Sequence, residues 1–229
     1  MFRAKFLTSA LLITAIFFSV AMPASAALPS ASSAATQSAS SEIKYYTINN
    51  DDITARVKKN VKTGQITYTS FYNISHVERA DLQNGAETAR QSGGKVFFYF
   101  DTLVSDRVTA RIIVNPFLVR SAEGGVSLVL DTSAANNKAV IDKFTGIFGR
   151  KVAVMRCSQS EDFGFTVVLA GKLDISGMDK NKLIAYSYDA ATNKYEKISA
   201  ANCTVDDQGF VYLESRKGGH IIIVENTAA

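Results

Sequence analysis

The sequence predicts an α+β fold, an antiparallel β-sandwich with about three helices drawn mainly from the N-terminal half. Apolar residues recur at helical spacing in three segments of that half, and short β-rich segments separated by turn residues follow Met155. A content of 47% hydrophobic residues is ample for a core. The alternative is a mixed sheet, because the helix between the strands near Tyr68 and Phe98 has the place of a parallel crossover.

The first 26 residues have the three regions of a secretory signal peptide. Arg3 and Lys5 form a basic start, an uncharged apolar stretch covers residues 7–22, and Ala24-Ser25-Ala26 supplies the small residues of a cleavage site. The apolar stretch is shorter than the roughly 20 residues that a membrane helix needs. We therefore expect cleavage after Ala26 and a secreted, extracellular protein with no membrane span after cleavage.

Residues 27–41 contain 11 Ala or Ser and no charge, which is typical of a flexible tether. We expect a single α+β domain over residues 42–229. A subdivision near residue 156 is an alternative, because helical patterns give way there to short strands.

The first helix is expected to begin at Asn50, whose side chain can cap it, with Asp51 and Asp52 in its first turn. Gly64 is expected to end it, and a β-rich run follows over residues 65–72. The apolar face of this helix consists of Ile53, Val57 and Val61.

A second helix is expected from the capping-box pattern Ser75-His76-Val77-Glu78, with Gly93-Gly94 at its end and a strand over residues 95–100. A third helix is expected over residues 134–148, followed by a strand over residues 151–155. The expected inward residues are Leu82, Ala86 and Ala89 in the second helix and Val140, Phe144, Ile147 and Phe148 in the third.

The remaining chain has the pattern of short strands joined by tight turns. A hairpin loop is expected at residues 189–193, and a turn at residues 206–209, where Gly209 supplies a positive φ. The expected strands cover residues 163–169, 182–188, 194–198, 209–213 and 220–224.

Three motifs follow one another in this C-terminal stretch: L-x-x-Y-x-Y, D-x-x-T-x-K-Y and V-D-x-x-G-F-V. Their residues are Leu183, Tyr186, Tyr188, Asp189, Thr192, Lys194, Tyr195, Val205, Asp206, Gly209, Phe210 and Val211. With the helix that closes in S-G-G-K-V, the pattern over about Ser75–Val224 resembles a module that ends many secreted proteins of Firmicutes. The segment Arg216–His220 departs from that pattern. The resemblance implies a mostly β, non-catalytic extracellular module.

The charge balance gives no indication of a polyanionic partner. Once Arg3 and Lys5 are removed with the signal peptide, 23 basic residues remain against 21 acidic ones. A nucleic-acid binder would show a concentrated basic patch, so we expect no nucleic-acid partner.

Cys157 and Cys203 are the only cysteines, and in an oxidising compartment such a pair can form one disulfide. Two buried free thiols are the alternative. Two cysteines and two histidines, scattered along the chain, lack the spacing of a zinc site. We expect no metal and no cofactor.

No catalytic constellation is visible. His220 lacks the sequence context of an activated nucleophile, and Glu161-Asp162 with Asp174 form the carboxylate set that a hydrolase alternative would use. Tyrosines are the notable surface candidates, because an exposed ring can stack on a sugar or anchor a protein. Those in the C-terminal strands are taken as candidate binding-face aromatics: Tyr186, Tyr188, Tyr195 and Tyr212.

The sequence therefore predicts a secreted, non-enzymatic module that binds a cell-surface polymer, a glycan or a secreted protein. A secreted hydrolase with a carboxylate-based site and a self-associating structural protein of the cell envelope are the alternatives.

Overall fold

The computed structural model describes residues 43–198 and 203–226, which belong to one compact unit. The predicted signal peptide (1–26) and tether (27–41) lie outside the described residues. Within the described residues, three α-helices and mixed β-sheets confirm the α+β class. The helices are α1 (Asn50–Asn60), α2 (Arg79–Gln91) and α3 (Lys138–Phe148). The strands are β1 (Tyr46–Thr47), β2 (Ile66–Tyr72), β3 (Ile74–Glu78), β4 (Lys95–Val104), β5 (Arg107–Val114), β6 (Gly125–Ser127), β7 (Leu130–Asp131), β8 (Val152–Lys172), β9 (Leu183–Asp189), β10 (Lys194–Lys197), β11 (Thr204–Val205) and β12 (Phe210–Glu225).

The large sheet has the strand order β10-β9-β12-β8-β5-β4-β2, with β11 added beside β12 and β7 beside β8. Its strand pairs are antiparallel except β2 and β4, which are parallel and joined through α2. The sheet is therefore mixed and contains the parallel crossover of the alternative prediction. A small sheet, β1-β3-β6, packs beside it.

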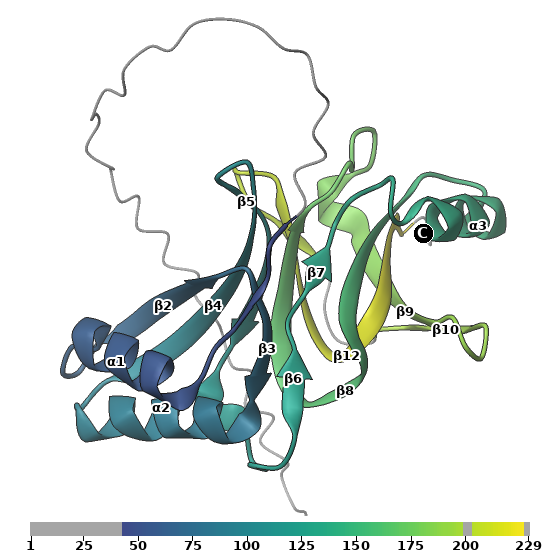
Figure 1. Ribbon diagram of the computed structural model, residues 1–229. Coiled ribbons are helices and arrows are strands. Elements are labelled where there is room, and N and C mark those ends of the chain that lie inside the picture. Colours follow the sequence, from purple (N-terminus) through teal and green to yellow (C-terminus); the bar gives the residue numbers. More distant parts are fainter. Residues whose placement is uncertain (1–42, 199–202, 227–229) are drawn as a thin grey trace, which may run out of the picture. The chain divides into compact units, whose positions relative to one another are not determined.

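Two long strands, β8 and β12, pair along almost their whole length and run through both ends of the large sheet. Their register shifts between Ser215 and Gly219, where the strands bend (Figure 1). A Cβ atom on Gly218 would lie 1.7 Å from the carbonyl oxygen of Gln159, so the close approach of the two backbones at the bend requires glycine.

The bend divides the large sheet into two halves. The first half-sheet consists of β2, β4 and β5 with the C-terminal part of β8 and the N-terminal part of β12. The second half-sheet consists of β7, β9 and β10 with the other parts of the two long strands. The inner faces of both halves contribute to one hydrophobic core, which contains Phe98, Ile112 and Leu169 of the first and Met155 and Ile221 of the second.

Helices α1 and α2 lie side by side and close the core over β2 and β4 (Figure 1). Ile53 of α1 and Leu82 of α2 are fully buried in it. A Cβ atom on Gly85 would lie 2.6 Å from the ring of Phe98, so glycine lets α2 approach β4 closely. The predicted buried face of α2, Leu82, Ala86 and Ala89, is confirmed.

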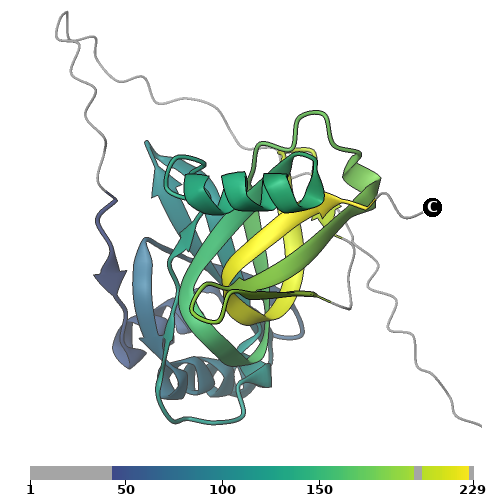
Figure 2. The ribbon, with the colours of Figure 1, turned by 90° about the vertical axis from the view of Figure 1, so that its right-hand side faces the viewer.

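Helix α3 covers the outer face of the second half-sheet, as Figure 2 shows. Phe144 is fully buried there in a second hydrophobic cluster. Ile147, which was expected to point inward, is 46% exposed. The sheet residues of this cluster are Val152, Val154, Ile184, Tyr188, Ile222 and Val224.

Helix α1 begins at Asn50 as predicted, but its cap and the start of α2 differ from the prediction. Asn49 rather than Asn50 caps α1, because its side-chain oxygen accepts a hydrogen bond from the backbone N–H of Asp52 at 3.0 Å. The predicted capping box at Ser75 is strand β3, where the hydroxyl of Ser75 donates to the carbonyl of Tyr46 at 3.2 Å. The pairing of β3 with β1 and β6 uses these residues as strand, so α2 begins only at Arg79.

Segments predicted as separate strands are joined in the structure. The predicted strands 151–155 and 163–169 are parts of β8, and 209–213 and 220–224 are parts of β12. The hydroxyl of Ser215 accepts from the N–H of Lys217 at 2.9 Å and donates to its carbonyl at 2.8 Å, so the chain bulges but stays in the sheet. Residue 156 lies inside β8, with no break in the chain's course there.

Candidate binding face

The outer face of the first half-sheet is an aromatic surface on which no helix among the described residues packs (Figure 1). Successive side chains of a strand point to opposite faces, so the residues that alternate with the core residues of these strands must lie on this side. The surface, called the aromatic face below, consists of Ile66, Tyr68, Tyr72, Phe97, Tyr99, Ile113 and Tyr212, with Asp101 and Arg111 between them.

Three large side chains of the edge strand β2 are among the most exposed apolar groups that the structure describes. Ile66 is 54%, Tyr68 56% and Tyr72 49% exposed. The ring of Tyr68 lies 5.8 Å from the ring of Phe97 and 5.1 Å from that of Tyr99, centre to centre. These contacts hold the rings in one continuous patch across β2 and β4.

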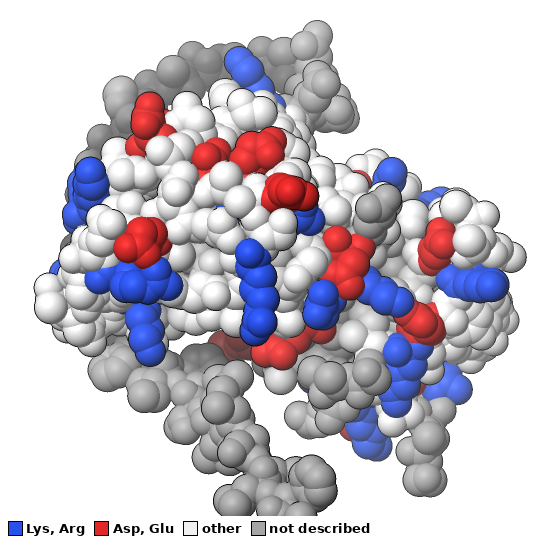
Figure 3. All heavy atoms as spheres, turned by 90° about the horizontal axis from the view of Figure 1, so that it is seen from below, with Lys and Arg blue, Asp and Glu red and all other residues white. Residues whose placement is uncertain are grey.

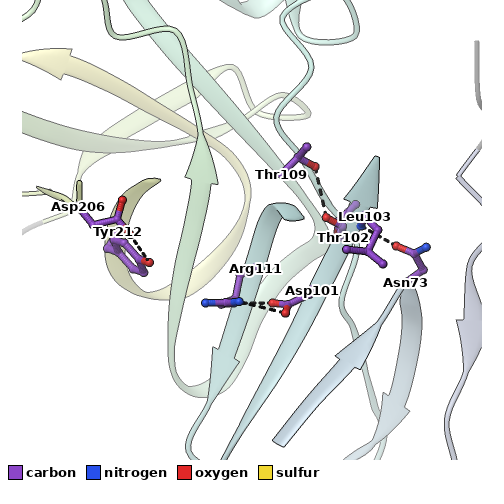
Figure 4. A network of polar contacts seen from close by, with 8 residues as sticks. All are labelled: Asn73, Asp101, Thr102, Leu103, Thr109, Arg111, Asp206 and Tyr212. Atoms are coloured by element: carbon purple, nitrogen blue, oxygen red, sulfur yellow. Dashed lines mark hydrogen bonds and ion pairs between the residues drawn. The ribbon is translucent and has the colours of Figure 1, made fainter. Parts of the chain in front are cut away.

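An ion pair between neighbouring strands neutralises the centre of this face (Figure 4). Arg111 of β5 donates two hydrogen bonds to the carboxylate of Asp101 on β4, at 2.5 and 3.1 Å. The Asp101 side chain is almost completely buried, and the guanidinium of Arg111 lies 4.4 Å from the ring centre of Tyr99. Burial alone would lower the pKa of Arg111, but the hydrogen bonds and the charge of Asp101 raise it overall. Arg111 therefore stays charged and lies against the carboxylate that it bonds to.

Tyr212 of β12 lies at the other end of the face. Its hydroxyl donates to the carboxylate of Asp206 at 2.9 Å, which fixes the ring position (Figure 4). Burial and the hydrogen bond to Asp206 raise the pKa of this phenol. Burial also raises the pKa of Tyr99, so both phenols remain neutral at physiological pH.

The structure separates the four candidate tyrosines. Tyr186, Tyr188 and Tyr195 lie on the face of the β9–β10 hairpin that packs against α3, where their rings contact Phe144 and Phe148 at centre-to-centre distances of 4.9 to 5.9 Å. Tyr188 is buried, Tyr186 is half-buried and Tyr195 is 44% exposed. Of the four, only Tyr212 belongs to the aromatic face.

The predicted disulfide between Cys157 and Cys203 is not formed in the structure, where both are buried free thiols. Arg156, the residue before Cys157, and Tyr188 of β9 both pair with His220 of β12, so Cys157 lies beside the Tyr188 end of β9. Cys203 lies at the other end of β9, where its N–H donates to the carbonyl of Leu183. Leu183 and Tyr188 are five residues apart in β9, which corresponds to about 17 Å. The Cα atoms of two cysteines in a disulfide lie within about 7 Å of each other, so these two cysteines are too far apart. Burial raises the pKa of both thiols to about 12.

Two of the carboxylates that a hydrolase would use, Asp162 and Asp174, are not brought together. Asp162 and Asp174 line different cavities with no residue in common. Hydrogen bonds from Lys151 and Ser176 lower the pKa of Asp174 to about 2, which keeps it ionised and unsuited to act as a general acid. No group of three or more metal-binding side chains occurs among residues 43–198 and 203–226.

Charges of both signs are interspersed on the surface seen in Figure 3. In the described part of the chain, no helix combines the length and the apolar character that a membrane crossing requires.

Comparison of the chain with models of protein families, with curated proteins and with solved structures found no match. The resemblance of residues 75–224 to the secreted module stays a prediction.

Sequence reasoning missed Phe97, Tyr99 and Arg111 as members of the aromatic face. The signal was present in the alternation of R-V-T-A-R-I-I-V over Arg107–Val114, which is typical of a strand with one buried face. Once this strand is recognised, Arg111 and Ile113 fall on its outer side.

Proposed function

We propose that the protein is a secreted, non-enzymatic module that binds a neutral glycan of a cell surface through the aromatic face. The observation that carries the proposal is the exposure of Tyr68 and Tyr72 beside Phe97 and Tyr99 on a sheet face without a covering helix. Large exposed apolar patches on soluble domains mark binding surfaces.

The chemistry of the face favours a sugar polymer. Sugar rings have apolar faces that stack on tyrosine rings, and hydroxyl rims that can bond to phenol groups. The charge at the centre of the face is cancelled within the Asp101–Arg111 pair, so an uncharged ligand meets no unpaired ion there. The rings follow one another across the neighbouring strands β2 and β4, which suits an extended chain better than a compact metabolite.

The test is cosedimentation of the purified protein with isolated cell envelopes, in low and high salt, before and after the envelopes are treated with protease. Saturable pelleting that survives salt and protease is expected. Tyr68→Ala combined with Tyr72→Ala should weaken binding at least about tenfold, which corresponds to roughly 1.4 kcal/mol, because two stacking rings are removed.

The matched control is Tyr46→Ala, which removes an equally exposed ring from β1, outside the aromatic face. Binding that falls equally in both variants would contradict the proposal. Loss of binding after protease treatment would assign the face to a protein partner. Concentration-dependent oligomers abolished by Tyr68→Lys would assign it to self-association.

A further inference from the structure

The aromatic face contains a continuous line of flat groups that crosses neighbouring strands. The ring of Tyr68 on β2 lies 5.1 Å from the ring of Tyr99 on β4, centre to centre. The centre of the Tyr99 ring in turn lies 4.4 Å from the guanidinium of Arg111 on β5. All three residues are at least partly exposed. This line runs across the strands and not along the edge strand β2.

Ala170 of β8 lets the line continue to β12. In the register of the sheet, Arg111, Ala170 and Tyr212 are neighbours on three successive strands, so their side chains point to the same side. Ala170 is fully buried although it lies on the outer face, as expected for a methyl group between two longer side chains. Figure 4 shows Arg111 between Asp101 and Tyr212. The half-buried ring of Tyr212 therefore follows Arg111 in the line.

Hydrogen bonds hold the inner groups of the line in place. Arg111 donates two bonds to the carboxylate of Asp101, and the hydroxyl of Tyr212 donates to Asp206 at 2.9 Å. A ligand that binds there has few side chains to order, which lowers the cost of binding. The next outer ring of β12, that of Phe210, is only 4% exposed. The line of accessible groups therefore ends at Tyr212.

The length of the line is set by the spacing of the strands. In the strand order β12-β8-β5-β4-β2, four intervals separate Tyr212 from Tyr68. Four intervals correspond to about 19 Å at the usual spacing of β-strands. One sugar ring is similar in size to a tyrosine ring and covers only a small part of this length. A chain with one sugar over each interval would contain about four sugars.

We infer that a linear glycan lies across the strands of the aromatic face, from Tyr68 to Tyr212, and that full affinity requires about four sugars. The inference rests on the proposed function and adds the direction and the minimum length of the ligand. Sugar rings stack on the tyrosine rings at the two ends. Between them, the guanidinium of Arg111, paired with Asp101, offers a flat surface with N–H donors for sugar hydroxyls.

The test measures affinity as a function of ligand length. Cell envelopes are partially hydrolysed, and the neutral oligosaccharides that are released are separated into fragments of two, four and six sugars. The full protein is titrated calorimetrically with each fragment. Four sugars should bind at least about tenfold more tightly than two, and six should add little, because the line ends at Tyr212.

Two variants locate the far end of the ligand. Tyr212→Ala should weaken the binding of four sugars at least about fivefold, because it removes one stacking ring. It should leave the binding of two sugars unchanged, since Tyr68 is retained, and that binding also shows that the variant is folded. Tyr212→Phe keeps the ring and should keep the effect of length. Tyr46→Ala, outside the aromatic face, is the control and should change neither affinity.

The outcomes distinguish this inference from the proposed function. Equal affinity for two and four sugars, or binding of four sugars that is unaffected by Tyr212→Ala, would overturn the inference alone. The glycan would then lie along β2, and the proposed function would stand. Equal losses in Tyr212→Ala and Tyr212→Phe would also overturn it, because the ring would not be the binding group. Binding of none of the fragments would overturn both.

Discussion

The two halves of the large sheet share β8 and β12 but differ in what lies on their outer faces. In the second half, α3 buries Phe144 against Val154 and Ile222. In the first half, Tyr68 is 56% exposed although its neighbours are equally aromatic. Both outer faces carry large aromatic side chains, so the difference is the covering helix rather than the presence of such rings. A covered face becomes core, and an uncovered one is available to a ligand.

The position of the uncovered face makes the contrast sharper. β2 and β4 are a parallel pair, and parallel strands are usually covered on both sides. Helices α1 and α2 cover only the inner side here. Departures from such a rule are expected at functional sites.

The largest expected effect concerns the covered face. Phe144→Ala should lower the free energy of unfolding by about 4 kcal/mol, because it leaves a cavity beneath α3. Ile147→Ala, on the same helix but 46% exposed, is the control and should cost less than about 1 kcal/mol. Denaturant titration measures both. Similar losses would mean that α3 does not bury a core.

The next effect concerns the ion pair at the centre of the uncovered face. Asp101→Ala leaves the half-buried Arg111 without its partner and should destabilise the protein by about 3 kcal/mol. The control is Glu78→Ala, which removes an exposed contact with His76 and should change the free energy of unfolding by less than about 1 kcal/mol. The same small change for both in thermal or chemical unfolding would show that the buried ion pair does not stabilise the first half-sheet.

Unfolding at alkaline pH tests whether the thiols of Cys157 and Cys203 are buried. The pKa of Cys157 and Cys203 is raised from about 9 to about 12, so the unfolded chain loses both protons first. Their contribution to stability is complete below pH 9 and is lost as pH rises toward 12, by about 1.4 kcal/mol per pH unit for each thiol. Unfolding measured between pH 9 and 11 should show a smaller slope for Cys203→Ala. An unchanged slope would contradict the burial of this thiol.

The smallest expected effect on stability concerns an exposed ring of the aromatic face. Tyr68→Ala should change the free energy of unfolding by less than about 1 kcal/mol, because the ring is largely exposed. Tyr188→Ala removes a buried ring of the covered face and should cost several times more. Calorimetric melting of the two variants compares the faces directly. Comparable destabilisation would show that the aromatic face serves stability.

Local signals were enough to predict all three helices, because each has its own apolar face and a clear end such as Gly149. They failed where long-range pairing decides the structure. The capping-box residues at Ser75 form a strand because β1 and β6 pair with it. The continuity of β12 through Ser215–Gly219 depends on a bulge opposite β8, which no local pattern specifies.

The same limit applies to the candidate site. Tyrosines in strands could be recognised, but which face is covered depends on where α3 packs. Tyr186, Tyr188 and Tyr195 share one hairpin, and α3 packs against the hairpin face on which their rings lie. Asp101 and Arg111 lie on the two consecutive strands of one hairpin, so their pairing follows once the strand over Arg107–Val114 is recognised, which the sequence analysis did not do.

The shared strand β12 also has a consequence for the order of folding. It is the last strand that the structure describes, and it pairs with β8 and with β9. Neither half-sheet is complete until β12 has been synthesised, so we expect the two halves to fold together rather than one after the other. Pairing between segments distant in sequence is slow to form.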